Sequence, residues 1–252
     1  MIAWPFLPDI PPIAIAHRGG CEGAGENTME AFAAAVEAGY RYVETDVHLS
    51  RDGEVVAFHD PDMRRLTGRA GRIDELDWPE IAATEVSGGG RIPLLAELLT
   101  AWPELYVNID PKSDAVVEPL TGLLRRLDAL DRVCIGSFST ERLRRMRRTL
   151  GPALATSMGP TEILRLRCAS LGLCPPPSGP VCAQVPIRQY GLPIVDARLL
   201  ACAHAAGLKV HVWTINDRPT MERLLDLGVD GIMTDNLKML KSVFQDRGIW
   251  PS

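Results

Sequence analysis

Acidic and histidine side chains occur in two segments with a spacing that could do chemistry. The segment ETDVHLSRDGEVVAFHD, residues 44–60, places Glu44 and Asp46 two positions apart and His59 at the end of an apolar run. Residues two apart on a strand project from the same face, so the two carboxylates would lie together. His17 follows the apolar run IAIA. Because an imidazole has a pKa of about 6.5, His17 and His59 could accept and donate protons near neutrality.

A divalent cation would account for the paired acids. Two neighbouring carboxylates repel each other, and in an apolar environment one stays protonated unless a cation compensates its charge. Asp110, which ends the run LYVNID, could supply a third carboxylate. Carboxylate oxygens suit Ca²⁺ or Mg²⁺. We predict metal ligands at Glu44, Asp46 and Asp110, although a bare pair of acids on a strand is more often solvated and structural.

Two basic side chains accompany these groups. Arg18 follows His17, and Lys112 lies two residues after Asp110. Arginine binds phosphate oxygens bidentately, and lysine acts as a point charge. Acids for a metal, two histidines and two cations suit a phosphodiester, since its transition state carries anionic oxygens and its leaving alkoxide needs a proton. The other histidines are expected to be structural: His48, His204 and His211.

Eight short apolar runs alternate with helical patterns and would position these side chains. This alternation predicts a parallel sheet, and 252 residues suit one (β/α)8 TIM barrel of the α/β class. In such a barrel the active site forms at the carboxyl ends of the strands, where the candidate residues lie. The predicted strands are residues 13–17, 42–47, 105–110, 132–138, 153–158, 181–186, 209–215 and 231–235.

Capping residues mark where several helices begin. Asn27 is the predicted N-cap of the first helix, with Glu30 three residues later. Asp196 would cap a later helix, and Asn216 or Asp217 another. Glycines would end the same three helices, at Gly39, Gly207 and Gly228.

The segment EVVAFHD follows the turn LSRDG too closely for a parallel crossover. We therefore predict that it returns antiparallel to the preceding strand as a hairpin. With the turn centred on residues 51–52, Leu49 would face Glu54. The same register would place Glu44 opposite His59, with Cβ atoms about 5 Å apart.

Residues 61–91 form the other departure from the alternation. They are polar and glycine-rich and contain only short helical pieces. An excursion of this length after a strand is usually functional, so we predict a small cap insertion over the barrel mouth. The expected organisation is one domain, residues 1–252, carrying this insertion.

Composition and charge argue against several classes of protein. The net charge is −5 and the pI is near 5.6, which gives no bulk attraction to nucleic acid. The segment MIAWPFLPDIPPIAIAH lacks a basic start and is interrupted by prolines, so we expect a cytoplasmic protein without stable membrane insertion. Six cysteines without CxxC spacing predict neither a zinc site nor a disulfide framework. The oligomeric state stays open.

The motifs together resemble those of the glycerophosphodiester phosphodiesterase family. Residues 16–60 hold AHRGG, GENT, ETDV, the DG pair and FHD in the order of that family. The similarity continues through RIPLLAELL, NIDPK, VHVWTIND and DGIMTD, and so covers nearly the whole chain. The resemblance implies a (β/α)8 barrel with a small insertion after the second histidine. It also implies cation-dependent hydrolysis of small-molecule glycerophosphodiesters to glycerol 3-phosphate and an alcohol, a reaction of lipid and glycerol metabolism.

The resemblance also implies roles for individual residues. His17 and His59 match the general acid–base pair, and Arg18 matches the phosphate ligand. Glu44 and Asp46 match the metal carboxylates. Lys112 matches the basic residue near the phosphate. Glu26 and Asn27 match the ENT element at the mouth, and Trp213 and Asn216 match the WTxN element that lines the pocket.

The sequence departs from the family pattern at two positions. Asp110 stands where the family has a glutamate, so a water could bridge its shorter side chain to the metal. Gly25 replaces the proline before ENT, which loosens the loop more than it affects the chemistry. Related phospholipase-like barrels use an internal hydroxyl as nucleophile and form a cyclic phosphate, a route that could also apply here. Which histidine is the acid and which the base stays open.

Two other functions fit parts of the pattern. A lysophospholipase D or phospholipase-like enzyme would need an apolar or basic surface at the mouth, for which residues 61–91 offer Met63, Leu66, Trp78 and several arginines. A non-catalytic barrel that binds a phosphorylated ligand would have lost a histidine or a metal acid. None is missing here apart from the change at Asp110.

Overall fold

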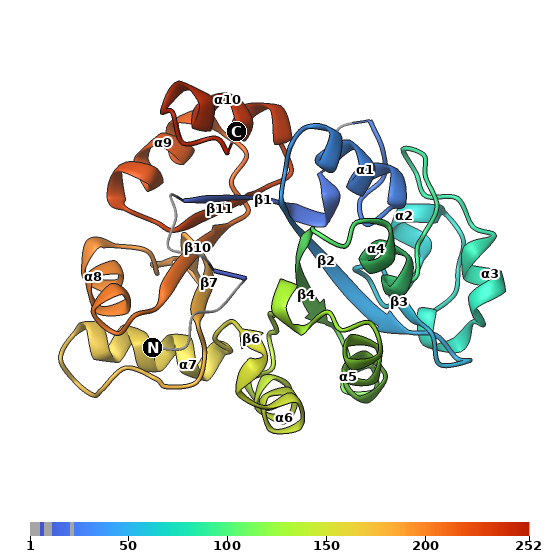
Figure 1. Cartoon of the computed structure of the whole chain (residues 1–252), viewed down its shortest axis with the longest axis horizontal. Helices are drawn as coiled ribbons and strands as arrows, with labels where there is room; N and C mark the ends of the chain where they lie inside the picture. The colour runs from blue at the N-terminus through green and yellow to red at the C-terminus, as the bar shows by residue number, and fades with distance from the viewer. Residues whose placement is uncertain (1–5, 8–11, 21–22, 252) are drawn as a thin grey trace.

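Eight parallel strands of the described chain form a nearly closed barrel with helices on the outside, which confirms the predicted (β/α)8 fold (Figure 1). The computed structural model describes residues 6–7, 12–20 and 23–251. Most of the N-terminal segment before residue 12, and Cys21, lie outside the described residues. Every predicted strand is present, as β1 (Ile13–Ala16), β2 (Tyr42–Leu49), β4 (Tyr106–Pro111), β5 (Val133–Ile135), β6 (Ala155–Thr156), β7 (Cys182–Pro186), β10 (Lys209–Trp213) and β11 (Gly231–Thr234).

The strands follow one another around the barrel. The neighbours are, in order, β6, β5, β4, β2, β1, β11, β10 and β7. A bridge between Ser157 and Cys182 joins the β6 side to β7. All four residues of β1 are buried, because the strands of a parallel barrel are covered on both faces. The carboxyl ends of β11, β1, β2 and β4 therefore lie next to one another.

Helices surround the barrel between the strands (Figure 1). The Asp196 and Asp217 carboxylates accept hydrogen bonds from Leu199 N and Thr220 N, and so cap two helices as predicted. The helices are α1 (Met29–Glu37), α4 (Leu95–Ala101), α5 (Val117–Arg126), α6 (Thr140–Leu150), α7 (Pro160–Ser170), α8 (Ala197–Ala205), α9 (Arg218–Leu227) and α10 (Leu237–Asp246).

The predicted cap of the first helix is wrong by one residue. Thr28 caps α1, because its hydroxyl oxygen accepts a hydrogen bond from Ala31 N at 3.1 Å and donates to Gly25 O at 2.7 Å. Asn27 has a φ of 57° and turns its side chain toward β2. Asn27 therefore binds side chains of β2, and Thr28 caps the helix.

The hairpin after β2 forms as predicted, but its register differs by one residue. Strand β3 (Val55–Ala57) runs antiparallel to β2, and Leu49 pairs with Val55 and not with Glu54. Gly53 has a φ of 92°, which makes it the left-handed residue of a three-residue loop. The sequence prediction had assumed a tighter turn.

The insertion after the hairpin has an apolar core of its own. It contains α2 (Arg64–Thr67), a 3-10 turn (Ile73–Glu75) and α3 (Trp78–Ala82), and it lies beside the β2–β3 hairpin outside the ring of strands (Figure 1). Its core includes Met63, Leu66, Ile73, Ile81, Val86 and Ile92. The burial of Met63 and Leu66 removes them from the apolar surface that a lipid-binding mouth would need.

Further features lie outside these predictions. A two-stranded sheet of β8 (Arg188–Gln189) and β9 (Leu192–Pro193) follows β7 and was not predicted, because strands of two residues show no alternation. Within the described residues, no helix is both long and apolar enough to cross a membrane. Cys134, Cys168, Cys174, Cys182 and Cys202 are free thiols.

Replacing Thr28 by alanine removes the oxygen that caps α1 and leaves the Ala31 amide without its acceptor. We expect the free energy of unfolding to fall by about 1–2 kcal/mol, the usual loss when a cap is removed. Urea denaturation followed by circular dichroism measures this change. Thr28→Ser keeps the oxygen and is the control, and an equal loss in both variants would contradict the capping role.

Candidate active site

His17 follows β1 and is held by a carboxylate from the neighbouring strand. His17 Nδ1 lies 2.6 Å from Oδ1 of Asp235, which directly follows β11. Asn216 donates from Nδ2 to Asp235 Oδ2 at 2.9 Å and so fixes that carboxylate. Burial lowers the pKa of His17, but the hydrogen bond to Asp235 and the charge of Glu44 outweigh burial and raise it above its usual value. The imidazole is therefore a stronger base than an exposed one.

Arg18 takes an uncommon backbone conformation, and its backbone and side chain contact three acids. Its φ is 53°, in the left-handed region. Its backbone N–H donates to Glu44 Oε2 at 3.2 Å. Its guanidinium donates to Glu26 Oε1 at 2.8 Å, and its Nε lies 3.1 Å from Asp46 Oδ2. Arg18 therefore contacts two of the three predicted metal acids, Glu44 and Asp46.

Glu44 and Asp46 project from the same face of β2, and the pKa values of their carboxyl groups are shifted in opposite directions. Burial and the charge of Asp46 raise the pKa of Glu44 to about 7. Burial also disfavours ionised Asp46, but Lys112 and Arg18 outweigh it and lower the pKa of that carboxyl. Asn27 Nδ2 donates to Asp46 Oδ2 at 3.0 Å. The metal-free site thus carries one firmly ionised acid and one that holds its proton to near neutrality.

Asp110 lies beside Asp46 across the pairing of β2 with β4, and its role as a metal ligand stays a prediction. The Lys112 ammonium lies 2.7 Å from Asp110 Oδ2 and 2.6 Å from Asp46 Oδ1, so it stands between the two carboxylates. Within the described chain, no three side chains of His, Cys, Asp or Glu are grouped to hold a metal ion. Glu44 and Asp46 still supply the hard oxygen donors that Ca²⁺ or Mg²⁺ prefers. A cation would also offset the charge that raises the pKa of Glu44.

His59 follows the hairpin strand and has a carboxylate partner of its own. His59 Nδ1 lies 2.6 Å from Asp60 Oδ1, and Asp60 in turn binds Arg65 of the insertion. The Arg65 Nη2 donates to Glu26 Oε1 at 2.6 Å. Since Arg18 also binds Glu26, a chain of ion pairs connects the His59 side of the site to the Arg18 side.

The predicted cross-strand pair of Glu44 and His59 does not form. The β2–β3 ladder ends at the pair of Val47 and Ala57, so His59 lies beyond it. The longer hairpin loop is the reason for this shift. His59 is nevertheless near the acids, because the backbone N–H of Phe58, one residue before it, donates to Asp46 O at 2.9 Å.

The remaining predicted residues support the site from its edges. Trp213 ends β10 and packs edge-on against Phe138, with ring centroids 5.7 Å apart. Asn216 acts on His17 through the Asp235 carboxylate. Glu26 and Asn27 hold Arg18 and Asp46. His48, His204 and His211 were expected to be structural, and His48 alone of these reaches the site, where its Nε2 lies 3.0 Å from His59 O.

Sequence reasoning missed Asp235 and Arg65 and gave no role to Asp60, although Asp60 ends the hairpin return. Asp235 ends a predicted strand, so the end-of-strand rule could have found it. Arg65 lies in the insertion, where nothing in the sequence distinguishes it from the neighbouring arginines. Only its contacts with Asp60 and Glu26 reveal its position.

The family comparison agrees with this geometry. Residues 17–239 match the model of the glycerophosphoryl diester phosphodiesterase family. The chain belongs to this family. The match begins at His17 and includes both histidines, the paired acids, the insertion and Asn216. The chain is therefore an enzyme, a phosphoric diester hydrolase.

Individual relatives cover nearly the whole of this family member. A Mycobacterium tuberculosis protein named probable glycerophosphodiester phosphodiesterase 2 is 39% identical over 244 residues, which is 94% of this chain and 92% of the relative. A glycerophosphodiester phosphodiesterase of Caldanaerobacter subterraneus is 30% identical and covers 94% of this chain and 99% of its own. An Oleispira antarctica phosphodiesterase, solved with its product sn-glycerol-3-phosphate, has the same fold, with a TM-score of 0.76 and 23% identity. The superposition covers 93% of this chain and 97% of the Oleispira chain.

The raised pKa of Glu44 predicts that the folded protein is more stable when the Glu44 side chain carries no negative charge. The unfolded chain loses the Glu44 proton at a pKa of about 4.5, whereas the fold retains it to about 7. Stability is therefore lost as the pH rises between these values. In the presence of a chelator, Glu44→Gln should raise the free energy of unfolding by roughly 1–3 kcal/mol at pH 8 and change it little at pH 4.5.

Urea denaturation at the two pH values measures this effect. Glu37→Gln, at an exposed position on α1, is the matched control and should show no such pH-dependent gain. If Glu44→Gln is no more stable than the parent at pH 8, the proposed cost of ionising Glu44 is wrong.

Proposed function

We propose that this enzyme hydrolyses glycerophosphodiesters to glycerol 3-phosphate and an alcohol, with His17 and His59 as its proton-transfer pair. The observation that carries the proposal is the pairing of each imidazole with its own carboxylate, Asp235 or Asp60, at one mouth. The product found in the Oleispira phosphodiesterase supports glycerol 3-phosphate as the product here.

Arg18 and Lys112 would hold the phosphate between the two histidines. Both cationic side chains contact Asp46, which fixes their positions, so that their N–H groups can donate hydrogen bonds to the phosphate. Lys112 is buried between two acids whose charges outweigh its desolvation, raise its pKa and keep it charged. Fixed donors of this kind stabilise the anionic oxygens of a phosphoryl transition state.

His17 fits the role of general base. Burial works against ionised Asp235, but its hydrogen bonds to His17 and Asn216 outweigh burial and lower its pKa, so this carboxylate accepts the proton on His17 Nδ1. Nε2 is then the free basic nitrogen, and it lies 3.8 Å from Glu44 Oε2. A glycerol hydroxyl on the Glu44 side would give its proton to Nε2 while its oxygen attacks phosphorus.

His59 fits the role of general acid. Its Nδ1 is held by Asp60, which leaves Nε2 to protonate the oxygen of the departing alcohol as the phosphorus–oxygen bond breaks. Attack by the glycerol 2-hydroxyl would produce a cyclic phosphate. Water would then open that ring, losing its proton to His59, while His17 returns its proton to the 2-oxygen.

A divalent cation fits the two acids of β2. Glu44 and Asp46 would hold it, and when bound it would supply positive charge for the phosphate and hydroxyl oxygens. Asp110 would act through Lys112, whose ammonium it positions. This arrangement differs from the three-carboxylate ligand set expected from the sequence.

Replacing either catalytic histidine by alanine should lower kcat/KM for glycerophosphodiesters by about 10²–10⁴-fold, the usual contribution of a positioned acid or base. Release of glycerol 3-phosphate by His17→Ala and His59→Ala measures this loss. His204→Ala is the control, because His204 forms a similar pair with Asp230 at 2.7 Å but lies on α8. Retained activity in His59→Ala would remove His59 from the mechanism.

Chelation should abolish turnover, and added Mg²⁺ or Ca²⁺ should restore it. Glu44→Gln should raise the cation concentration for half-maximal activity by about 10–100-fold, since it removes a direct ligand. Asp110→Asn should shift that concentration less, because Asp110 contacts Lys112. Cation titrations of the three proteins decide this, and full activity in excess chelator would refute the proposed cation.

A further inference from the structure

A cavity of about 560 Å³ opens beside the proposed site. His59 and Lys112 line it, whereas His17 and Glu44 are not among the described residues that do. The cavity therefore extends from the His59 side alone. It can receive one of the two groups esterified to the phosphate, while the other remains near His17.

The insertion forms one wall of this cavity and is fastened to the hairpin beside it. Ile73 N donates to Pro61 O at 3.0 Å, and Arg51 N donates to Leu76 O at 2.9 Å. The Ile73 side chain is fully buried in the core of the insertion. The 3-10 turn, which carries Asp74 and directly follows Arg72, is therefore held in position against the hairpin that ends at His59.

The wall residues offer both hydrogen-bond donors and acceptors. Arg72 and Asp74 form a bidentate pair, with both contacts at 2.9 Å, and their side chains are 46% and 57% exposed. The His59 carbonyl oxygen can only accept, so His48 carries its proton on Nε2 and presents Nδ1 as an acceptor. Ser113 adds a hydroxyl from the loop after β4.

The same lining is poorly suited to a cationic head group. Asp74 is the one carboxylate among the described lining residues, since the acids that pair with Arg51 and Lys112 lie outside that lining. None of the described lining residues is Phe, Tyr or Trp. A quaternary ammonium is recognised mainly by aromatic faces. Leu49, Pro61 and Ala115 also line the cavity, but an acyl chain there would still have to desolvate Arg72 and Asp74, which is costly.

We propose that this cavity binds the alcohol part of the substrate and favours an uncharged, hydroxyl-rich alcohol such as glycerol or inositol. The inference rests on the proposed function and specifies its substrate class. Each hydroxyl both donates and accepts, so a polyol pairs with Arg72 and Asp74 together. The alcohol oxygen then lies at His59, which protonates it, while the attacking glycerol hydroxyl lies on the His17 side.

Filling the cavity tests which group it holds. Ala115 is exposed at its edge, so Ala115→Trp narrows it without disturbing the core. KM for sn-glycero-3-phosphoinositol should rise by about tenfold or more, equivalent to about 1.4 kcal/mol of binding. The methyl ester of glycerol 3-phosphate releases methanol, which is too small to fill the cavity, and its kinetics should stay within about twofold.

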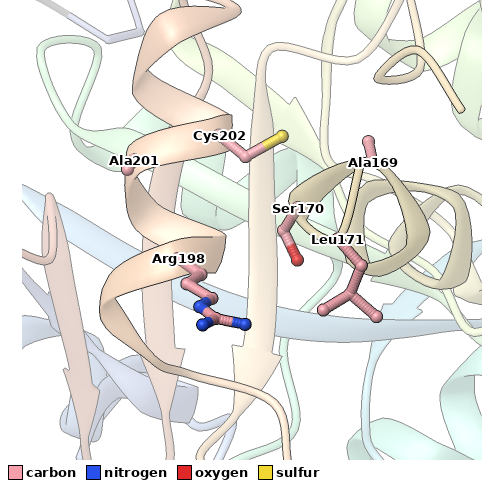
Figure 2. Close-up of a pocket in the computed structure, with 6 residues that line it drawn as sticks. All are labelled: Ala169, Ser170, Leu171, Arg198, Ala201 and Cys202. Atoms are coloured by element: carbon pink, nitrogen blue, oxygen red, sulfur yellow. The ribbon is translucent and has the colours of Figure 1, made fainter. Parts of the chain in front are cut away.

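Two further variants complete the experiment. Asp74→Ala should raise KM for the inositol ester and reduce its advantage over sn-glycero-3-phosphocholine. Ala201→Trp is the matched control, because Ala201 lies with Arg198 and Cys202 on α8 beside a second cavity of about 500 Å³, between α7 and α8 (Figure 2). This variant should leave both substrates unaffected.

Three outcomes would overturn the inference. An equal effect of Ala115→Trp on both esters would mean that the cavity holds the shared glycerol phosphate, and no effect on either would mean that it holds neither group. Choline-ester turnover as efficient as inositol-ester turnover in the parent would refute the polyol class. If the parent hydrolyses none of the esters, the proposed function fails. The affinity for the inositol ester can then be measured by calorimetric titration of His17→Ala and of the double variant His17→Ala/Ala115→Trp. Weaker binding by the double variant would show that the cavity binds the alcohol, and equal binding would show that it does not.

Discussion

The buried carboxylate of Asp46 is the group on which the arrangement of the site depends. It is 2% exposed, and its oxygens contact Arg18 and Asn27 from the β1–α1 connection and Lys112 from the end of β4. An unpaired charge at this depth would be strongly unfavourable, so the three partners are required together. The same charge raises the pKa of Glu44, two residues away. One strand thereby holds two acids in different charge states, a common feature of catalytic sites.

The two histidines obtain similar partners from different parts of the fold. His17 uses Asp235, which is adjacent because β1 and β11 pair in parallel and place their carboxyl ends side by side. His59 uses its own neighbour, Asp60, and reaches the Arg18 side only through Arg65 of the insertion. The barrel therefore orients His17, and the hairpin with its insertion orients His59. This difference gives the two ends of a bound phosphodiester different surroundings.

In the proposed function, the barrel strands and the hairpin carry the reacting groups, and the insertion contributes to selectivity. The strands supply the acids and cations, and the insertion supplies the Arg72 and Asp74 wall of the adjoining cavity. Insertions on barrel loops can change while the strand ends that hold the chemistry stay the same. The apolar core of the insertion is separate from the barrel core and includes Val56 and Phe58 of the hairpin, so the insertion packs against the hairpin.

The sequence by itself determined the barrel strands, the hairpin and the insertion and indicated the candidate site residues, because βα periodicity and strand ends are local patterns. It did not determine the hairpin register, since that depended on the backbone conformation of one glycine, Gly53. Nor did it show that Lys112 separates Asp110 from the paired acids, or that Asp235 holds His17 across 218 positions of the chain. Those contacts exist only once the strands have closed into a barrel, because closure brings together side chains that are distant in sequence.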